Sequence, residues 1–335
     1  MELFPDGIYV RLRSRVHGTY LHADEDGVGV SLRPRGGGGE VPSAAGVWRV
    51  HRVLRDGIHY VLLHGAAYGL YLALSTDEAA PPPQGCVGRR VVQRGFDHPE
   101  LDAVMWRAVP VADGGGYVLL RHVYNGNLRA NGRFCFWNNS GVSLDYYFGT
   151  RSTMRHWTVE VVPPMPQGAP PPELPHPTRP AFTEKPGGRS GFLFLQHDEP
   201  EKDGRRVIRH LRSDEPLNFG HTDVPFFSFY GRSVYNLRTQ LGIRANQGNV
   251  FDTRMCVQAG LYGRLTPLVN DLPHIDELMN IVIFTAGAPA LVIRVSPFGE
   301  VRYLKFSKWC YDDDVKGIST DENRNVTSNI GRSSQ

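Results

Sequence analysis

The stretch YVRLRSRVHGTYL at residues 9–21 returns twice along the chain, and this recurrence decides the fold. The related stretches are YVLLHGAAYGLYL at residues 60–72 and YVLLRHVYNGNLR at residues 117–129. Each opens with Tyr-Val and has a glycine nine positions later, at Gly18, Gly69 and Gly126. Alternating apolar and polar residues, followed by a polar or aromatic residue and a glycine, are typical of a β-hairpin with a tight turn. In such a turn the residue before the glycine is expected to have a positive φ.

Each copy also closes on a tryptophan within a short apolar stretch, at Trp48, Trp106 and Trp157. Between the hairpin and the tryptophan lies a less regular strand, which reads VGVSLRP, CVGRRVVQ and GVSLDYY in the three copies. Three copies of about four strands predict a β-trefoil, in which a six-stranded barrel is closed by three hairpins and exposes no sheet edge. A three-bladed propeller is the alternative, but propellers have four or more blades.

Within the first copy, alternation places Val10 and Leu12 on the inward face of the strand. The tryptophans are expected to fill the core. In the third copy Leu128 comes one residue early, which predicts a turn or strand that differs there by one residue. The glycine-rich and proline-rich insertions, LRPRGGGGEVPSAAG and STDEAAPPPQG, are expected to be flexible surface loops.

The second half begins with a proline-rich stretch, PPMPQGAPPPELPHPTRP at residues 163–180, which predicts an extended linker. We therefore expect a trefoil at 1–162, a linker at 163–190, a second domain at 191–310 and a disordered tail at 311–335. Strands are expected at GFLFLQ, RRVIRHL, PFFSFYG, RMCVQAG and the end of ELMNIVIFTAG, and ALVIRV and EVRYLKF are expected to form a hairpin. A helix should begin after Ser233 as N-cap, bury Val234, Leu237 and Leu241, and end before Gly242. This order predicts a mainly β protein whose second, α+β domain is a ubiquitin-like β-grasp.

Composition and charge limit the kinds of partner and the cell compartments that we expect for this protein. A net charge of +3 over 335 residues is too small for nucleic-acid binding by bulk electrostatics. The four cysteines, Cys86, Cys135, Cys256 and Cys310, have no metal-ligand spacing. The start MELFPDGIYV does not resemble a signal peptide, and no apolar run is long enough to span a bilayer. We expect reduced thiols and a location in the cytoplasm, with the nucleus as the alternative.

The sequence offers no catalytic or cofactor motif, so we expect neither an enzyme nor a bound cofactor or metal. His17, His22 and His122 are interpreted as surface residues of hairpins, and Cys135 as a buried, inert thiol between Phe134 and Phe136. Sugar-binding trefoils of the ricin-B type resemble one another through Gln-x-Trp in each copy. Here Gly46, Val104 and Arg155 stand two residues before the tryptophans, which disfavours that class.

Three motifs carry a family resemblance: VRLRSRVHGTYLHADEDG, MWRAVPV and MCVQAGLYGRLTPLVNDLP. Through them the chain resembles a plant family of uncharacterised proteins with a fascin-like, or actin-cross-linking-like, β-trefoil at the N-terminus. The resemblance covers both halves in order. It implies a non-enzymatic protein-interaction protein, with actin filaments as the suggested partner. Fascin-type bundlers carry several trefoils, whereas cross-linking by this chain would need a second site in the C-terminal domain or self-association.

Alternative functions are a trefoil that binds a carbohydrate or small ligand, and an adaptor that acts through the ubiquitin-like domain. Arg11, Arg13 and Arg15, which are peculiar to the first copy, are the candidate partner-binding residues, as a contact for an anionic surface.

Overall fold

The computed structural model describes residues 3–34, 43–77, 88–98, 101–112, 115–131, 141–146, 152–163, 205–214, 217–245 and 253–284, together with the backbone of two later strands. The proposed linker and tail, the expected strand GFLFLQ, both flexible insertions and Cys135 lie wholly or mostly outside these residues.

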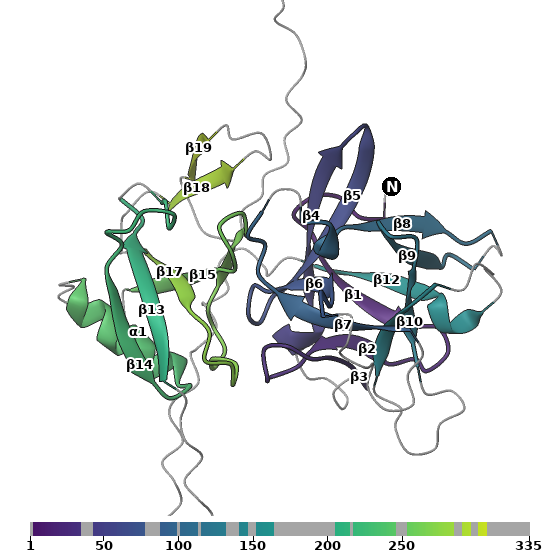
Figure 1. The fold of residues 1–335 in the computed structure, drawn as a ribbon, viewed down its shortest axis with the longest axis horizontal. Coiled ribbons are helices and arrows are strands. Elements are labelled where there is room, and N and C mark those ends of the chain that lie inside the picture. The colour runs from purple at the N-terminus through teal and green to yellow at the C-terminus, as the bar shows by residue number, and fades with distance from the viewer. Residues whose placement is uncertain are drawn as a thin grey trace, which may run out of the picture.

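The N-terminal part folds into three copies of a four-stranded unit, as the repeats predict (Figure 1). The first copy contains β1 (Tyr9–Ser14), β2 (Tyr20–Ala23), β3 (Val30–Arg33) and β4 (Trp48–Arg55). The second contains β5 (Ile58–Gly65), β6 (Tyr71–Leu74), β7 (Arg89–Arg94) and β8 (Trp106–Pro110). The third contains β9 (Val118–His122), β10 (Asn127–Ala130), β11 (Val142–Asp145) and β12 (Trp157–Val162).

The first and last strands of each copy close a six-stranded barrel. β1 pairs with β4, β4 with β5, β5 with β8, β8 with β9, β9 with β12, and β12 with β1 again. The other strands form the hairpins β2–β3, β6–β7 and β10–β11. This ring identifies a β-trefoil and excludes the three-bladed propeller, because blades of a propeller do not pair into one barrel.

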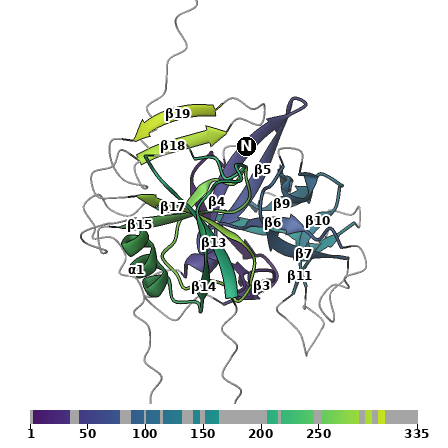
Figure 2. The same ribbon diagram turned by 60° about the vertical axis from the view of Figure 1, so that its left-hand side comes forward.

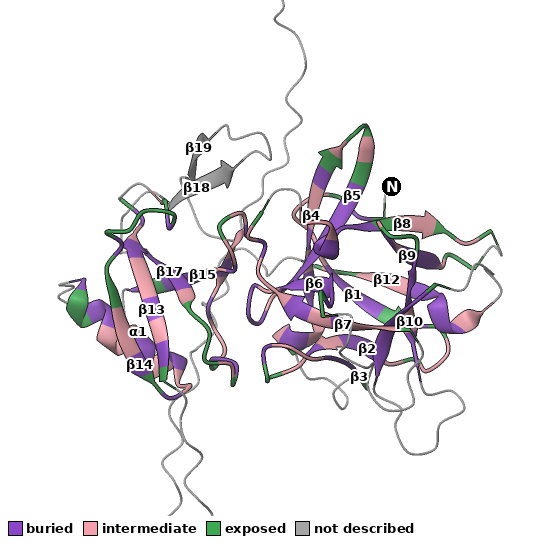
Figure 3. Ribbon diagram, in the orientation of Figure 1, coloured by how far each residue is buried: buried purple, intermediate pink, exposed green. Residues whose placement is uncertain are grey.

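The three tryptophans occupy equivalent positions in the barrel core, which confirms the core interpretation. Trp48, Trp106 and Trp157 are fully buried, and each follows a short 3₁₀ turn. Their indole Nε1 groups donate hydrogen bonds to the carbonyl oxygens of Leu21 (3.2 Å), Leu72 (2.9 Å) and Leu128 (3.0 Å). Each tryptophan therefore ties the closing strand of its copy to the hairpin of the same copy. The opening strands β1, β5 and β9 are mostly buried, whereas the closing strands β4, β8 and β12 are largely intermediate or exposed beyond their tryptophans (Figure 3).

The turn of the third copy differs from the other two, as the early Leu128 predicts. Gly18 and Gly69 have φ of 69° and 70°, whereas in the third copy Asn125 has φ of 64°. The backbone N–H of Ser14 donates to the carbonyl of Thr19, five positions later, whereas the N–H of His122 donates to the carbonyl of Gly126, four positions later. The third turn is therefore one residue shorter. The expectation that the residue before glycine has positive φ is thus right only at Asn125, and wrong in copies one and two.

The second domain is a β-grasp with one helix packed on a mixed sheet, as Figure 2 shows from a second direction. Its elements are β13 (Arg205–Arg212), β14 (Phe226–Tyr230), α1 (Val234–Arg244), β15 (Arg254–Gln258), β16 (Leu265–Pro267) and β17 (Met279–Phe284). The strand order is β14-β13-β17-β15-β16, with β13 and β17 parallel. The strands β18 (Ala290–Val295) and β19 (Val301–Phe306) form the separate antiparallel hairpin that the sequence predicts.

The helix begins as its sequence predicts. The side chain of Ser233 accepts a hydrogen bond from the backbone N–H of Asn236, and Val234, Leu237 and Leu241 are fully buried against the sheet. The predicted end before Gly242 is wrong, because the helix continues to Arg244. The opposite face of the sheet is covered in part by the segment 217–224, from which Phe219 and Val224 pack against residues of β13, β15 and β17.

Candidate functional site

The three candidate arginines do not gather into one cationic patch. The Arg11 side chain is buried, with its guanidinium 3.9 Å from the Tyr20 ring centre and 3.9 Å from Glu160. Arg13 is exposed and forms an ion pair with Glu160 at 2.9 Å. Arg15 lies over the Tyr117 ring. An anionic contact by these side chains stays a prediction, and such a contact would compete with the intramolecular partners.

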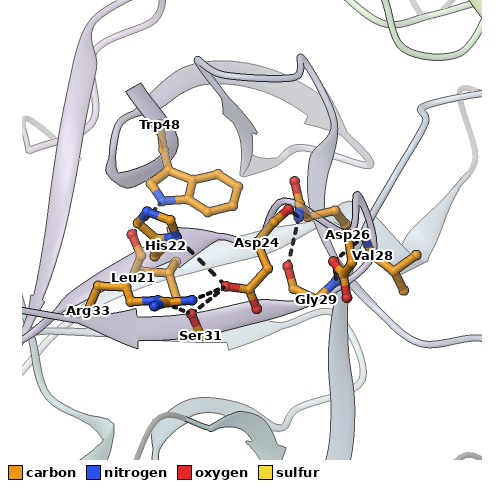
Figure 4. A network of polar contacts seen from close by, with 10 residues as sticks. Leu21, His22, Asp24, Asp26, Val28, Gly29, Ser31, Arg33 and Trp48 are labelled. Atoms are coloured by element: carbon orange, nitrogen blue, oxygen red, sulfur yellow. Dashed lines mark hydrogen bonds and ion pairs between the residues drawn. The ribbon is translucent and has the colours of Figure 1, made fainter. Parts of the chain in front are cut away.

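A polar network lies on the first hairpin, around Asp24 (Figure 4). The hydroxyl of Ser31 donates to Asp24 at 2.5 Å, and the side chains of His22 and Arg33 each lie 3.8 Å from the same carboxylate. These contacts lower the pKa of Asp24, although burial opposes them. Because Asp24 is saturated by its own hairpin, the network is best explained as the local stabilisation of the β2–β3 loop.

The third hairpin repeats part of this arrangement with a different residue. Asn131, at the position of Asp24, donates a hydrogen bond from Nδ2 to the hydroxyl of Ser143 at 2.8 Å. Both side chains are buried. The surface interpretation of the hairpin histidines is wrong for His122, which is buried against Trp106 and bonds the carbonyl of Ala103. Burial lowers the pKa of His122 to about 4.

Within the described ranges, no group of three or more His, Cys, Asp or Glu side chains is arranged to hold a metal ion. In the same ranges, no helix combines the length and apolar character needed to cross a membrane.

A continuous interface joins the two domains, a feature that no local sequence pattern indicated. Arg264, between β15 and β16, donates its backbone N–H to the hydroxyl of Tyr71 at 3.0 Å, and its guanidinium pairs with Asp6 at 2.9 Å. Tyr71 is fully buried, and burial raises its pKa to about 12. The Thr266 hydroxyl lies 3.2 Å from Nδ1 of His64, which is also fully buried.

Backbone contacts reinforce this interface. The N–H of Phe96 donates to the carbonyl of Ala259 at 2.9 Å, and the N–H of Tyr262 donates back to Phe96 at 2.8 Å. A side chain at Gly260, which has φ of 82°, would collide with the backbone of Phe96. Further along, the N–H of His274 donates to the carbonyl of Glu25 at 2.7 Å. The side of the second domain that carries β16 is therefore occupied by the trefoil. In Figure 1, the neighbouring strand β15 lies on the side of the domain nearer the trefoil.

The far side of the second domain carries the most exposed aromatic residues of the described chain. On β14, Phe227 and Phe229 point toward the helix and core, so Phe226, Ser228 and Tyr230 point to the opposite face. Phe226 is 72% exposed and Tyr230 is 64% exposed. On the neighbouring β13, Arg205 lies opposite Tyr230 and Arg209 lies opposite Phe226. We call these five residues the β14 face.

The two arginines of this face are held in place by the second domain itself. Arg205 donates from Nε to the Ser228 hydroxyl at 3.0 Å. Arg209 donates to the carbonyl of His221 at 2.8 Å. The alternation in RRVIRHL and PFFSFYG contained the signal for this face, because each strand places two large or charged residues on the side away from the core.

The fold and these surfaces define a class of protein in which a β-trefoil is joined to a ubiquitin-like domain. Residues 1–160 match the β-trefoil domain of unknown function (DUF569), and residues 204–284 match the ubiquitin-like domain that is associated with that trefoil. This confirms the predicted fold class and the suspected family architecture. No curated protein resembles the sequence closely enough to count as a relative.

Among solved structures, the designed three-fold symmetric protein ThreeFoil is 22% identical, covers 45% of this chain and 96% of its own, and has a TM-score of 0.35. A Caenorhabditis elegans protein of unknown function is 14% identical, covers 48% of this chain and 97% of its own, and has a TM-score of 0.37. SeviL, solved with the asialo-GM1 saccharide, is 12% identical, covers 46% and 97%, and has a TM-score of 0.32. These similarities carry no inference about a ligand of this chain.

Proposed function

We propose that the chain is a non-enzymatic adaptor that binds a protein partner through the β14 face. The observation that carries this proposal is the pair of exposed aromatic rings, Phe226 and Tyr230, beside Arg205 and Arg209. Aromatic residues and arginine are enriched in the energetically dominant part of protein interfaces. Their exposure on one strand has no role in packing the β-grasp core, which Phe227 and Phe229 serve instead.

The domain interface supports the same proposal. Arg264 and Thr266 attach the β16 side of the second domain to the trefoil, which leaves the β14 face on the side away from it. A binding face held on a larger body loses less freedom on association than one on a mobile domain, and less ordering cost favours affinity. The trefoil would thus act as the support of the interaction surface.

Point variants test the proposal better than removal of residues 190–310, because that deletion would expose Tyr71 and Phe96, which the second domain covers. We expect the Phe226→Ser/Tyr230→Ser double variant to lose the partner proteins that the wild-type chain enriches in proximity labelling in cells. Leu54→Ser is the matched control, since Leu54 is an exposed apolar residue of the trefoil hairpin β4–β5.

The comparison requires that the double variant keep the thermal stability of wild type, as expected for surface changes. Identical labelling of wild type and a folded double variant would contradict the proposal. Loss of the same partners in Leu54→Ser would also contradict it, because the effect would then not belong to the β14 face.

Filament binding by the trefoil remains the second proposal, and it would use the exposed side chains of Arg13 and Arg15. Salt-sensitive co-sedimentation with actin filaments would support it, and absence of pelleting at physiological salt would overturn it. A carbohydrate-binding trefoil predicts signals on a glycan array. For all of these activities, the cytoplasm or nucleus remains our proposed location.

A further inference from the structure

The strand β14 is the terminal strand of its sheet on the side away from the trefoil. The backbone N–H of His210 donates to the carbonyl of Pro225 at 3.0 Å, which fixes the alternation along β13 and β14. In an antiparallel pair, hydrogen-bonded and non-hydrogen-bonded positions alternate. The pairs formed by Phe226, Ser228 and Tyr230 are therefore the non-hydrogen-bonded ones. The N–H and C=O groups of these three residues point to the edge of the sheet with which no strand of the described residues pairs.

The side chains at those three positions do not protect the edge. Natural proteins block edge strands with charged residues, prolines or bulges on the strand itself. Here β14 presents Phe226, Ser228 and Tyr230 without a charge or a proline within the strand. The other terminal strand of the sheet, β16, is treated differently, because its Thr266 lies against His64 of the trefoil.

The charges around the edge indicate which strand could pair with it. Arg205 and Arg209 flank the face on β13. On the other, helix-bearing face of the sheet, the guanidinium of Arg244 at the end of α1 lies 3.9 Å from the Phe227 ring centre. Pairing of β14 with β14 of a second copy would bring the arginines of both copies together, and like charges across an interface are unfavourable. An acidic segment would gain from all three.

We propose that β14 binds an extended acidic segment of a partner protein as an additional strand of the sheet. Backbone hydrogen bonds to Phe226, Ser228 and Tyr230 supply the pairing, the two exposed rings contact alternate side chains of the segment, and the arginines select acidic residues. This inference rests on the proposed function and specifies its partner.

The substitution Ser228→Pro tests the pairing directly. It removes an N–H that points away from β13, so the β13–β14 ladder keeps its hydrogen bonds, and proline is tolerated at such edge positions. Ser228→Ala is the matched control, because both variants lose the Arg205–Ser228 hydrogen bond but only one loses the N–H. A phage-displayed random peptide library, selected on the full-length chain, supplies the probe.

We expect the selection to enrich acidic peptides, measured afterwards as labelled synthetic peptides by fluorescence anisotropy. Ser228→Pro should weaken their binding by about tenfold or more, whereas Ser228→Ala should change it by less than about threefold. Alternate backbone N–H groups of an added strand point toward β14 or away from it. Methylation of the peptide nitrogens that face β14 should therefore abolish binding, and methylation of the other set should be tolerated. Arg205→Glu should weaken binding most at low salt.

Each outcome separates the two proposals. If peptides lose affinity for Phe226→Ser/Tyr230→Ser but bind Ser228→Pro as wild type, the β14 face binds protein and strand addition is wrong. If the enriched peptides are not acidic, the assigned partner chemistry is wrong. If no peptide depends on either variant, strand addition is overturned, and the partner labelling in cells still decides the proposed function independently.

Discussion

The Thr266 hydroxyl of the ubiquitin-like domain lies 3.2 Å from Nδ1 of His64 in the trefoil barrel, and both side chains are buried. Burial, together with the nearby cations Arg49 and Arg264, holds the pKa of His64 well below its usual range. His64 is therefore neutral at physiological pH, and its Nδ1 depends on the other domain for a hydrogen bond. This pair therefore links a buried polar group of the trefoil to the domain attached to it.

Thr266→Val is expected to lower the free energy of unfolding by about 1–3 kcal/mol, because it leaves Nδ1 of His64 buried without its partner. Thr266→Ser keeps the hydroxyl and is the control. Urea denaturation followed by tryptophan fluorescence, to which the buried Trp48, Trp106 and Trp157 of the trefoil contribute, measures the effect. Equal stability of the valine and serine variants would show that the contact does not couple the domains.

His122 predicts a specific dependence of stability on pH. Its pKa is about 4 in the folded chain, against about 6.5 when unfolded, so the unfolded state binds more protons between these values. The free energy of unfolding therefore falls as the pH falls from about 6.5 to about 4, by roughly 3 kcal/mol from this group. His122→Gln keeps a donor toward Ala103 and should flatten the dependence in that window. An unchanged slope would contradict the assignment.

Asn125 predicts different effects of two small substitutions. Its φ of 64° lies in the left-handed region, where residues other than glycine and asparagine are strained. Asn125→Ala should therefore destabilise the chain by about 1 kcal/mol, whereas Asn125→Gly should be neutral within about 0.5 kcal/mol. Thermal unfolding compares the two variants. A glycine variant no more stable than the alanine variant would show that the positive φ at this position does not determine the effect.

Local patterns were sufficient for most of the elements. The recurring Tyr-Val, turn and tryptophan predicted twelve strands in three equivalent units, and the Ser233 cap with Val234, Leu237 and Leu241 predicted the helix. Both signals act over a few residues. The helix ends at Arg244 and not before Gly242, because glycine only favours termination; Leu241 and Ala245, on either side of this last stretch, are both buried in the core of the domain.

The candidate site was less accessible to sequence reasoning. The arginines of the first copy alternate along the sequence, yet Glu160, far along the chain, ties Arg11 and Arg13 to the closing strand β12. The alternation in PFFSFYG predicts two faces of a strand, one of which is the β14 face. The sequence does not say which face is buried, because that depends on the elements that pack against the strand.

The sequence by itself thus determined the trefoil repeats, the β-grasp order and the positions of the turns, although not the conformation of the first two turns, because hydrophobic period, caps and turn residues act within a short stretch of chain. Only the tertiary structure decided that Tyr71 and His64 are covered by Arg264 and Thr266, and that β14 rather than β16 is the open edge. Those contacts join residues that are separated by about two hundred positions. Their strength comes from burial that exists only when both domains are folded, and no local pattern records it.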